Sequence, residues 1–340
     1  MKKSFYSLDF KQLEMELSPS AAAILFNHHY KKRIQEQDYK DVSKEALSYI
    51  KENYCFKLPV IDKVVESEDR TVKFLIELAD GSKVESVLIP FQNKYSLCLS
   101  SQVGCAMNCS FCFTGTQGLK RNLKVEEIIG QFLLAHQWLR ENRAGDERIL
   151  NLVFMGQGEP LHNFDAVKTA CDIFLSKYGA SIGHQKITIS TSGYLPGLKR
   201  WSKEIPGVNL ALSLHSPFSQ KRDELIPINK KYPLEEVLKT IENIPLARKQ
   251  FITYEYLLIK DFNDSEEDAR KTGELLKGKT AYINLIPFNP FPGSAFKRPE
   301  LKITERFKEV LDEYQIPTLI RVVKGDDVLA ACGQLNSSPS

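Results

Sequence analysis

The 340-residue sequence has no apolar run close to the roughly 18 residues that a membrane-spanning helix needs. Acidic residues such as Asp9 and Glu14 interrupt the N-terminal segment, which is unlike a secretory signal peptide. The chain also contains no internal repeat and no low-complexity segment. We therefore expect a cytoplasmic protein that does not contact a membrane.

The sequence also lacks a strong excess of charge of either sign. Its formal net charge is +3, so composition alone does not indicate a nucleic-acid-binding protein, and a polyanionic partner would have to bind a local basic patch. Hydrophobic residues make up 42% and charged residues 26% of the chain, which is ordinary for a globular protein and excludes a disordered or fibrous one.

The cysteines lack the even number and regular spacing of a secreted disulfide framework. There are seven of them, unevenly distributed, which favours metal or thiol chemistry in a reducing compartment. The segment GCAMNCSFC places Cys105, Cys109 and Cys112 in a C-x3-C-x2-C array. Because a 4Fe-4S cluster held by three cysteines leaves one iron open to an exogenous ligand, the array predicts a catalytic cluster.

Two other interpretations of the array fit its neighbours less well. Three cysteines at i, i+4 and i+7 could share one buried helix face, but Gly104, Asn108 and Ser110 do not suit a packed face. A structural zinc site would need a fourth ligand nearby. Cys171 is too distant in sequence, and it lies on the apolar face of its own predicted helix, where a buried structural thiol is the simpler interpretation.

The chain divides into segments with different hydrophobic periodicity. Residues 1–68 show apolar positions at helical spacing and predict a small accessory helical domain. In residues 69–93, two runs of period 2 flank Asp80 and Gly81, which predicts a linking β-hairpin.

From residue 94 to 336, short apolar strands alternate with amphipathic helices, and residues 337–340 form a frayed tail. This alternation implies parallel strands with crossover helices, in either a closed or partial β/α barrel or an open doubly wound sheet. Both architectures place functional loops at the carboxyl ends of the strands.

One such loop contains the segment MGQGEP. Its G-x-G pattern is weak by itself and fits a tight turn between a strand and a helix. Small residues at this turn would let the backbone approach a ligand, and Glu159 could accept a hydrogen bond from the ammonium of a bound amino acid.

Taken together, these motifs resemble those of the radical S-adenosylmethionine (radical SAM) enzymes, and more specifically the RlmN/Cfr family of RNA adenosine methyltransferases. The resemblance covers roughly residues 70–336. It rests on these segments, in the family's order: CLSSQVGCAMNCSFCFTGTQGLKRNL, FMGQGEPLHN, ITISTSGYLPGL, LALSLHSP, IPINKKYPL, NLIPFNPFPG and GDDVLAACGQL. It implies an α/β fold, a partial (β/α)6 radical SAM barrel with the helical accessory domain and the linking hairpin. Phe113 and Gln157 depart from the family pattern without affecting a chemical role.

The resemblance implies two cofactors, a 4Fe-4S cluster on the three cysteines of the array and S-adenosylmethionine. It assigns cofactor binding to Gly158, Glu159, Ser190, Ser213, Leu214, His215 and Asn289. A lone histidine at the end of a strand is more often a hydrogen-bonded structural residue than an acid or base, so we expect no proton transfer by His215.

The resemblance also implies a covalent mechanism. Cys332 accepts a methyl group, Cys98 is its resolving partner and Glu85 accepts a proton, whereas the two cysteines taken alone would be interpreted as buried thiols. The implied reaction methylates carbon 2 of an adenosine in 23S rRNA, tRNA or both, through a methylated cysteine and a 5'-deoxyadenosyl radical. The alternatives are methylation of carbon 8, as in the Cfr type, and a non-catalytic RNA-binding protein with a structural zinc ion.

The resemblance implies that release of the product leaves a disulfide between Cys98 and Cys332. The implied partners are therefore RNA and an external electron donor, flavodoxin-like or of another kind, which reduces this disulfide after each turnover. Residues 1–68 are a candidate RNA-binding unit, and we expect a monomer. Basic residues that follow the predicted strands could form a phosphate-binding rim: Lys120, Arg121, Lys124, Lys230, Lys231, Lys297 and Arg298. Alternatively, these basic residues lie on solvated loops and bind no phosphate.

Overall fold

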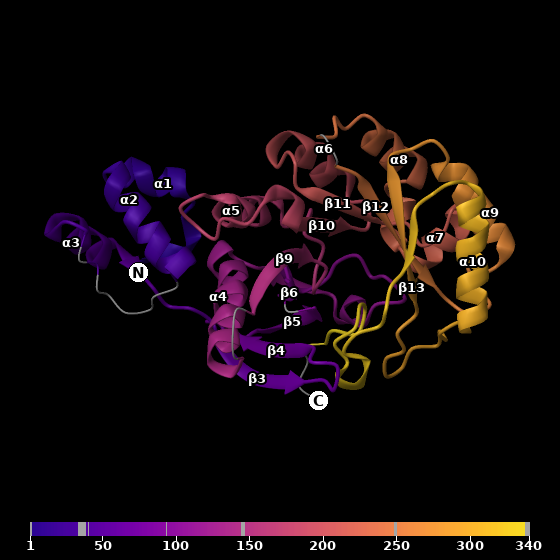
Figure 1. Cartoon of the computed structure of the whole chain (residues 1–340), viewed down its shortest axis with the longest axis horizontal. Coiled ribbons are helices and arrows are strands. Elements are labelled where there is room, and N and C mark those ends of the chain that lie inside the picture. Colours follow the sequence, from indigo (N-terminus) through magenta and orange to yellow (C-terminus); the bar gives the residue numbers. More distant parts are fainter. Residues whose placement is uncertain are drawn as a thin grey trace.

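The computed structural model describes residues 2–32, 39, 41–92, 94–143, 147–247 and 250–336. The predicted tail at 337–340 lies outside these described residues. A helical N-terminal unit lies beside a larger α/β body (Figure 1). No helix in the described part of the chain combines the length and apolar character needed to cross a bilayer.

The α/β body is built on a ten-stranded sheet of order β14-β13-β12-β11-β10-β9-β6-β5-β4-β3. Its neighbouring strands from β6 to β14 are parallel. These strands are β6 (Lys94–Cys98), β9 (Arg148–Phe154), β10 (Ile187–Thr191), β11 (Asn209–Ser213), β12 (Ile252–Leu258), β13 (Ala281–Pro287) and β14 (Thr318–Ile320).

Helices connect each parallel strand to the next. They are α4 (Val125–Asn142), α5 (Phe164–Leu175), α6 (Leu195–Glu204), α7 (Ser219–Leu225), α8 (Leu234–Glu242), α9 (Glu266–Leu276) and α10 (Leu301–Glu313), with short turns η4 (His184–Lys186) and η5 (Pro227–Lys230). Strands that follow one another along the chain are also neighbours in the sheet, so every connection has the same sense and the sheet curves into an open barrel (Figure 1). This confirms the predicted partial (β/α)6 barrel.

Three antiparallel strands extend the sheet beyond β6. They are β3 (Val60–Glu66), β4 (Val72–Glu77) and β5 (Lys83–Phe91). The β4–β5 turn contains Gly81, whose φ of +80° is accessible to glycine without strain. The predicted hairpin is therefore present, but β5 pairs with β6 and makes the hairpin part of the barrel sheet. The sequence analysis placed β3 within the helical segment, because this edge strand is largely exposed and lacks a clear apolar alternation.

The N-terminal unit contains the expected helices. Its elements are β1 (Lys3–Ser4), η1 (Phe5–Ser7), α1 (Phe10–Glu16), α2 (Pro19–Phe26), η2 (Asn27–Lys32), α3 (Lys44–Asn53) and β2 (Tyr54–Cys55). Asp9 and Gln12 form a capping box at the start of α1, and Ser18 caps α2 immediately before Pro19. The aromatic rings of Phe10 and Tyr178 stack at 4.4 Å between their centroids and join this unit to the barrel.

The C-terminal segment, residues 321–336, returns across the antiparallel strands (Figure 1, yellow). It contains the turn η6 (Asp326–Val328). The Ser67 hydroxyl donates to Asp327 Oδ1 at 2.6 Å, and the Gly325 N–H donates to Asp69 Oδ2 at 3.1 Å. These contacts hold the segment against the sheet and thereby fix the position of Cys332.

Candidate active site

The three-cysteine loop is closed by close backbone contacts. It lies between β7 (Gln102–Gly104) and η3 (Phe113–Gln117), and β8 (Leu119–Asn122) pairs with β7. Gly104 has a φ of +74°, and a Cβ atom at this position would lie 1.8 Å from the Gly118 carbonyl oxygen. The Cys105 N–H donates to that same oxygen at 3.0 Å. The loop therefore requires a residue without a side chain at Gly104.

Replacing Gly104 by alanine should prevent the loop from closing, so that the protein binds much less iron. Gly81→Ala is the matched control, since Gly81 also has a positive φ but a Cβ atom there would meet nothing within 4 Å. Both variants carry a similar backbone strain. Iron analysis after anaerobic reconstitution distinguishes them, and equal iron contents would contradict the structural role assigned to Gly104.

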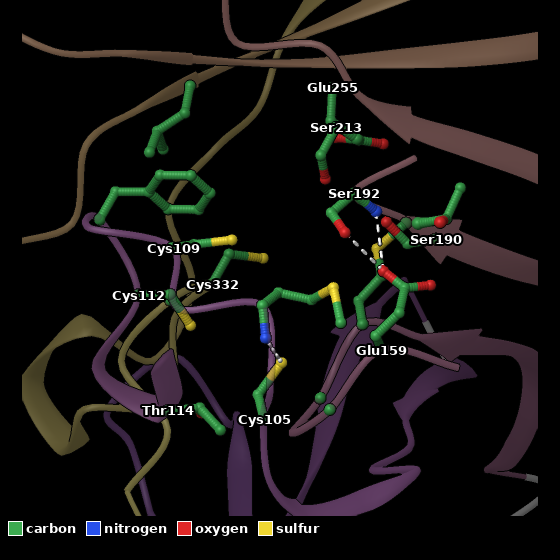
Figure 2. Close-up of a pocket in the computed structure, with 18 of the residues that line it drawn as sticks. Cys105, Cys109, Cys112, Thr114, Glu159, Ser190, Ser192, Ser213, Glu255 and Cys332 are labelled. Atoms are coloured by element: carbon green, nitrogen blue, oxygen red, sulfur yellow. Dashed lines mark hydrogen bonds between the residues drawn. The ribbon is translucent and has the colours of Figure 1, made fainter. Parts of the chain in front are cut away.

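The three sulfur atoms line one cavity at the carboxyl ends of the barrel strands (Figure 2). Residues from strands β10 to β13, from the loops that follow β9, β10 and β11, and from the C-terminal segment complete it. They include Gly156, Gly158, Glu159, Ser190, Ser192, Ser213, His215, Glu255, Ile286, Arg321 and Cys332. The array and the predicted ligand-binding turns therefore meet in one place.

The arrangement of the thiols fits an iron–sulfur cluster better than a single zinc ion. Burial raises the pKa of Cys105 to about 12 and also raises the pKa values of Cys109 and Cys112, so the cavity disfavours thiolates without a bound cation. Within the described ranges, no three Cys, His, Asp or Glu side chains converge on one metal ion. Zinc needs such convergence, whereas a cluster binds each thiolate at a different iron.

Glu159 is held rigidly on the opposite side of the cavity from the cysteines (Figure 2). Its Oε2 atom accepts hydrogen bonds from the backbone N–H and the hydroxyl of Ser192, both at 2.8 Å, and Oε1 accepts one from the Leu161 N–H at 3.1 Å. Burial raises the pKa of Glu159, and the Ser192 hydrogen bonds oppose this shift. Oε1 therefore retains capacity for another donor, such as a ligand ammonium, whereas Oε2 already accepts two hydrogen bonds.

Gly158 lets the turn before Glu159 pack closely. It has a φ of +99°, and a Cβ atom there would lie 2.5 Å from the Cβ of Gln102. The Gln102 side-chain oxygen in turn accepts a hydrogen bond from the Glu159 N–H at 2.8 Å. The G-x-G pattern therefore forms a tight turn that positions the carboxylate.

The other predicted cofactor residues, on β10, on β11 and directly after β11, divide into two groups. Ser190, Ser213 and His215 line the cavity, whereas the Leu214 side chain is fully buried in the hydrophobic core. His215 Nδ1 accepts a hydrogen bond from the Leu257 N–H at 3.1 Å, so in the neutral ring the proton is on Nε2. Burial and the nearby Arg222 lower the pKa of His215 to about 3, which is compatible with a structural, hydrogen-bonding role.

Asn289 lies at a second cavity instead. Its side-chain N–H donates to the Cys332 carbonyl oxygen at 3.2 Å, and its Oδ1 accepts from Arg298 at 3.1 Å. This second cavity is lined by Cys98, Asn289, Arg321 and Cys332, among others. The side chain that the resemblance assigned to cofactor binding is thus engaged with the backbone of the Cys332 segment.

Cys332 is half-buried and lines both cavities, as do Met155, Ile286 and Arg321. Cys98 is buried on β6, where it packs with Ala330 and Leu335 on either side of Cys332. Burial raises the pKa of Cys98 to about 12. The structure therefore places the two predicted thiols around the same junction between the cavities.

Glu85 lies on β5 beneath the same C-terminal segment. Its Oε2 atom accepts a hydrogen bond from the Asn336 N–H at 2.6 Å, and its Oε1 atom lies 3.1 Å from the Lys73 ammonium. The backbone is fixed as well, because the Glu85 N–H donates to Gln157 Oε1 at 3.0 Å. The predicted proton acceptor is therefore buried and precisely oriented near the segment that carries Cys332.

The sequence analysis missed several charged residues of the site. Arg222 on α7 is fully buried, and it donates to the carbonyl oxygens of Ser192, Ser213 and Leu214 at 2.8, 3.0 and 3.1 Å. It thereby ties together the ends of β10 and β11 that line the cavity. Glu255 carries the clearest signal, since it is a charged residue inside the apolar strand FITYEYLLI.

Comparisons with known proteins agree with this site. Residues 99–272 match the Radical SAM superfamily. "Dual-specificity RNA methyltransferase RlmN" of Rhodopseudomonas palustris is 46% identical over 309 residues, 87% of this chain and 77% of that relative. The protein of the same name from Vesicomyosocius okutanii is 40% identical over 320 residues, 91% of this chain and 89% of that relative.

A solved structure is similar over almost the whole fold. The radical SAM methyltransferase from Sphaerobacter thermophilus superposes with a TM-score of 0.89 at 33% sequence identity, covering 99% of this chain and 100% of that one. These similarities extend beyond the barrel to the N-terminal unit and the C-terminal segment. The chain therefore belongs to the radical SAM superfamily and, within it, to the RlmN family.

Proposed function

We propose that this protein methylates carbon 2 of an adenosine in RNA, with 23S rRNA and tRNA as the substrate classes. The observation that carries the proposal is the position of Cys332, which lines both the cavity with the three-cysteine loop and the cavity that contains Cys98. A sulfur at this junction can take a methyl group on one side and deliver it on the other. Family membership supports the same activity.

Each part of the first cavity has a role in this proposal. A 4Fe-4S cluster on Cys105, Cys109 and Cys112 would supply the electron that cleaves S-adenosylmethionine to a 5'-deoxyadenosyl radical. Glu159 would accept a hydrogen bond from the ammonium of the methionine moiety. Ser190, Ser213 and the His215 Nε2–H offer further polar contacts along the strand ends.

The chain's own thiols would carry the methyl group. Cys332 Sγ takes a methyl group by displacement from S-adenosylmethionine, and its methyl carbon, after loss of a hydrogen atom, bonds to the adenine. The resulting radical adduct must lose one electron, which the oxidised cluster would accept, and one proton from carbon 2, which Glu85 accepts. Cys98 Sγ then attacks Cys332 Sγ, so that a disulfide forms as the bond from Cys332 to the methylene carbon breaks. The electron pair of that bond stays on the methylene carbon, which takes up a proton and becomes the methyl group on the adenine.

The proposal includes two partners and a location. RNA phosphates would bind exposed lysines near the loops of the barrel mouth, which are Lys120, Lys124, Lys230, Lys231 and Lys297. Arg121 and Arg298 would contribute less to phosphate binding, because they already form ion pairs with Glu127 and Asp326, respectively, at 2.8 Å. An external electron donor, flavodoxin-like or other, would reduce the disulfide.

We propose a cytoplasmic monomer in which residues 1–68 also contact RNA.

Anaerobic assay of the reconstituted protein with ribosomal and transfer RNA transcripts tests this function. Nucleoside mass spectrometry should detect 2-methyladenosine in the treated RNA. Detection of 8-methyladenosine alone would replace the proposal by the Cfr-type reaction. Unmodified RNA together with stoichiometric zinc in the protein would favour the non-catalytic RNA-binding alternative.

A further inference from the structure

Lys73 joins the proposed proton acceptor to the segment that carries the methylated cysteine. Its ammonium lies 3.1 Å from Glu85 Oε1 and also donates a hydrogen bond to the Leu329 carbonyl oxygen at 3.1 Å. The side chain of Lys73 is 15% exposed and that of Glu85 is 5% exposed. An ion pair this well shielded from water interacts more strongly than one on the surface.

The strand register explains how these groups meet. Lys73 on β4 is opposite Val87 on β5, and Val87 is opposite Cys98 on β6. Glu85 lies two residues from Val87 and so projects from the same face of the sheet. The C-terminal segment covers this face and adds the Asn336 N–H as a second partner of the Glu85 carboxylate. Lys73, Glu85 and Cys98 thus share one face beneath the Cys332 segment.

Glu85 can accept a proton only if its carboxyl group is ionised, and a nearby cation favours that ionised form. Burial raises the pKa of Glu85, while the Lys73 ammonium and the Asn336 N–H lower it. A buried carboxyl group without these partners would become neutral and could not accept a proton.

The charged and titratable groups around this face come from several elements. Lys83, on the same face of β5, is paired with Asp62 and Glu77. On β6 and the C-terminal segment, Cys98 and Cys332 interact with Arg321. Within the described residues, Lys73 is therefore the cation that forms an ion pair with Glu85.

We propose that Lys73 is a positioning residue for proton transfer: it holds the Glu85 carboxylate ionised and oriented beneath the segment that presents Cys332. This inference rests on the proposed function, in which Glu85 is the proton acceptor. In that step the C–H bond at carbon 2 breaks, its electron pair stays with the adenine ring, and an O–H bond forms on Glu85. Lys73 neither gains nor loses a proton.

The pH dependence of product release tests this role. In Lys73→Met and Lys73→Gln, loss of the cation should raise the pKa of Glu85. The carboxylate would then be ionised only at higher pH. We expect the acidic limb of the single-turnover rate to move upward by about 1–3 pH units, with recovery at the alkaline end. Lys73→Arg, which retains the charge, should keep the limb close to its original position.

Two measurements separate this inference from folding defects and from the proposed function. Methylation of Cys332, read by protein mass spectrometry, and cluster content precede the step at Glu85, so both should be retained in the Lys73 variants. A rate lowered equally at every pH, or an unshifted acidic limb, would overturn the role of Lys73. Full turnover by Glu85→Gln would instead refute the proposed role of Glu85 itself.

Discussion

Replacing Cys332 by alanine should abolish methyl transfer to RNA and leave the iron content and visible spectrum of the protein unchanged. Cys332 lies on the C-terminal segment, outside the three-cysteine loop, and no other thiol lines both cavities in the part of the chain described. Methyl transfer is measured by nucleoside mass spectrometry. The iron content shows that the loss of activity does not come from loss of the cluster.

Replacing Cys98 by alanine should instead trap the protein on its RNA. Without the attacking sulfur, the bond between Cys332 and the methylated base cannot be resolved. Denaturing gel electrophoresis would show a protein–RNA adduct. Cys55→Ala is the control, since Cys55 lies on β2 in the N-terminal unit and lines neither cavity. Full turnover by Cys332→Ala or Cys98→Ala would remove that residue from its proposed role.

Of the variants considered, Arg222→Met should show the largest decrease in the free energy of unfolding. The guanidinium is fully buried and donates to Ser192, Ser213, Leu214 and Asn229. Leaving a buried acceptor without a donor costs about 1–3 kcal/mol, so losing the donors to these four acceptors should lower the free energy of unfolding by about 4 kcal/mol or more. S-adenosylmethionine affinity should fall as well, because the ends of β10 and β11 lose their common anchor.

Arg306→Met on α10 provides the comparison for Arg222. Arg306 pairs with Glu266 and Glu309 at 45% side-chain exposure, and exposed pairs contribute little to stability. Denaturant unfolding of the two apoproteins should show a clear loss for Arg222→Met and almost none for Arg306→Met. Equal transitions would mean that Arg222 does not organise the strand ends as we describe.

The barrel could be predicted from sequence because its elements have strong local patterns. Helix α8 has apolar residues at Leu234, Val237, Leu238 and Ile241, which is the spacing of one helix face. Helix α7 was not predicted, since its sequence SQKRDEL shows no such spacing. The path of the C-terminal segment was also beyond prediction, because the contact between Ser67 and Asp327 joins distant parts of the chain.

The residues of the site likewise divide into those that a local sequence pattern reveals and those that no local pattern reveals. Cys105, Cys109 and Cys112 form an array whose spacing alone indicates metal chemistry, and the structure brings their sulfurs to one cavity. The proposed roles of Cys98 and Cys332 rest on family resemblance, since isolated cysteines in apolar segments carry no local signal. Roles for Lys73 and Arg222 depend on partners from other elements, so no pattern in the sequence could reveal them.

We propose that the three-cysteine loop holds an iron–sulfur cluster, on which the whole reaction depends. Its most direct test is metal and sulfide analysis, with a visible spectrum, of protein purified without oxygen. We expect brown protein with about four iron and four sulfide ions per chain, and colour that is lost in Cys109→Ser. A colourless protein that holds one zinc ion in tetrahedral protein coordination would contradict the account.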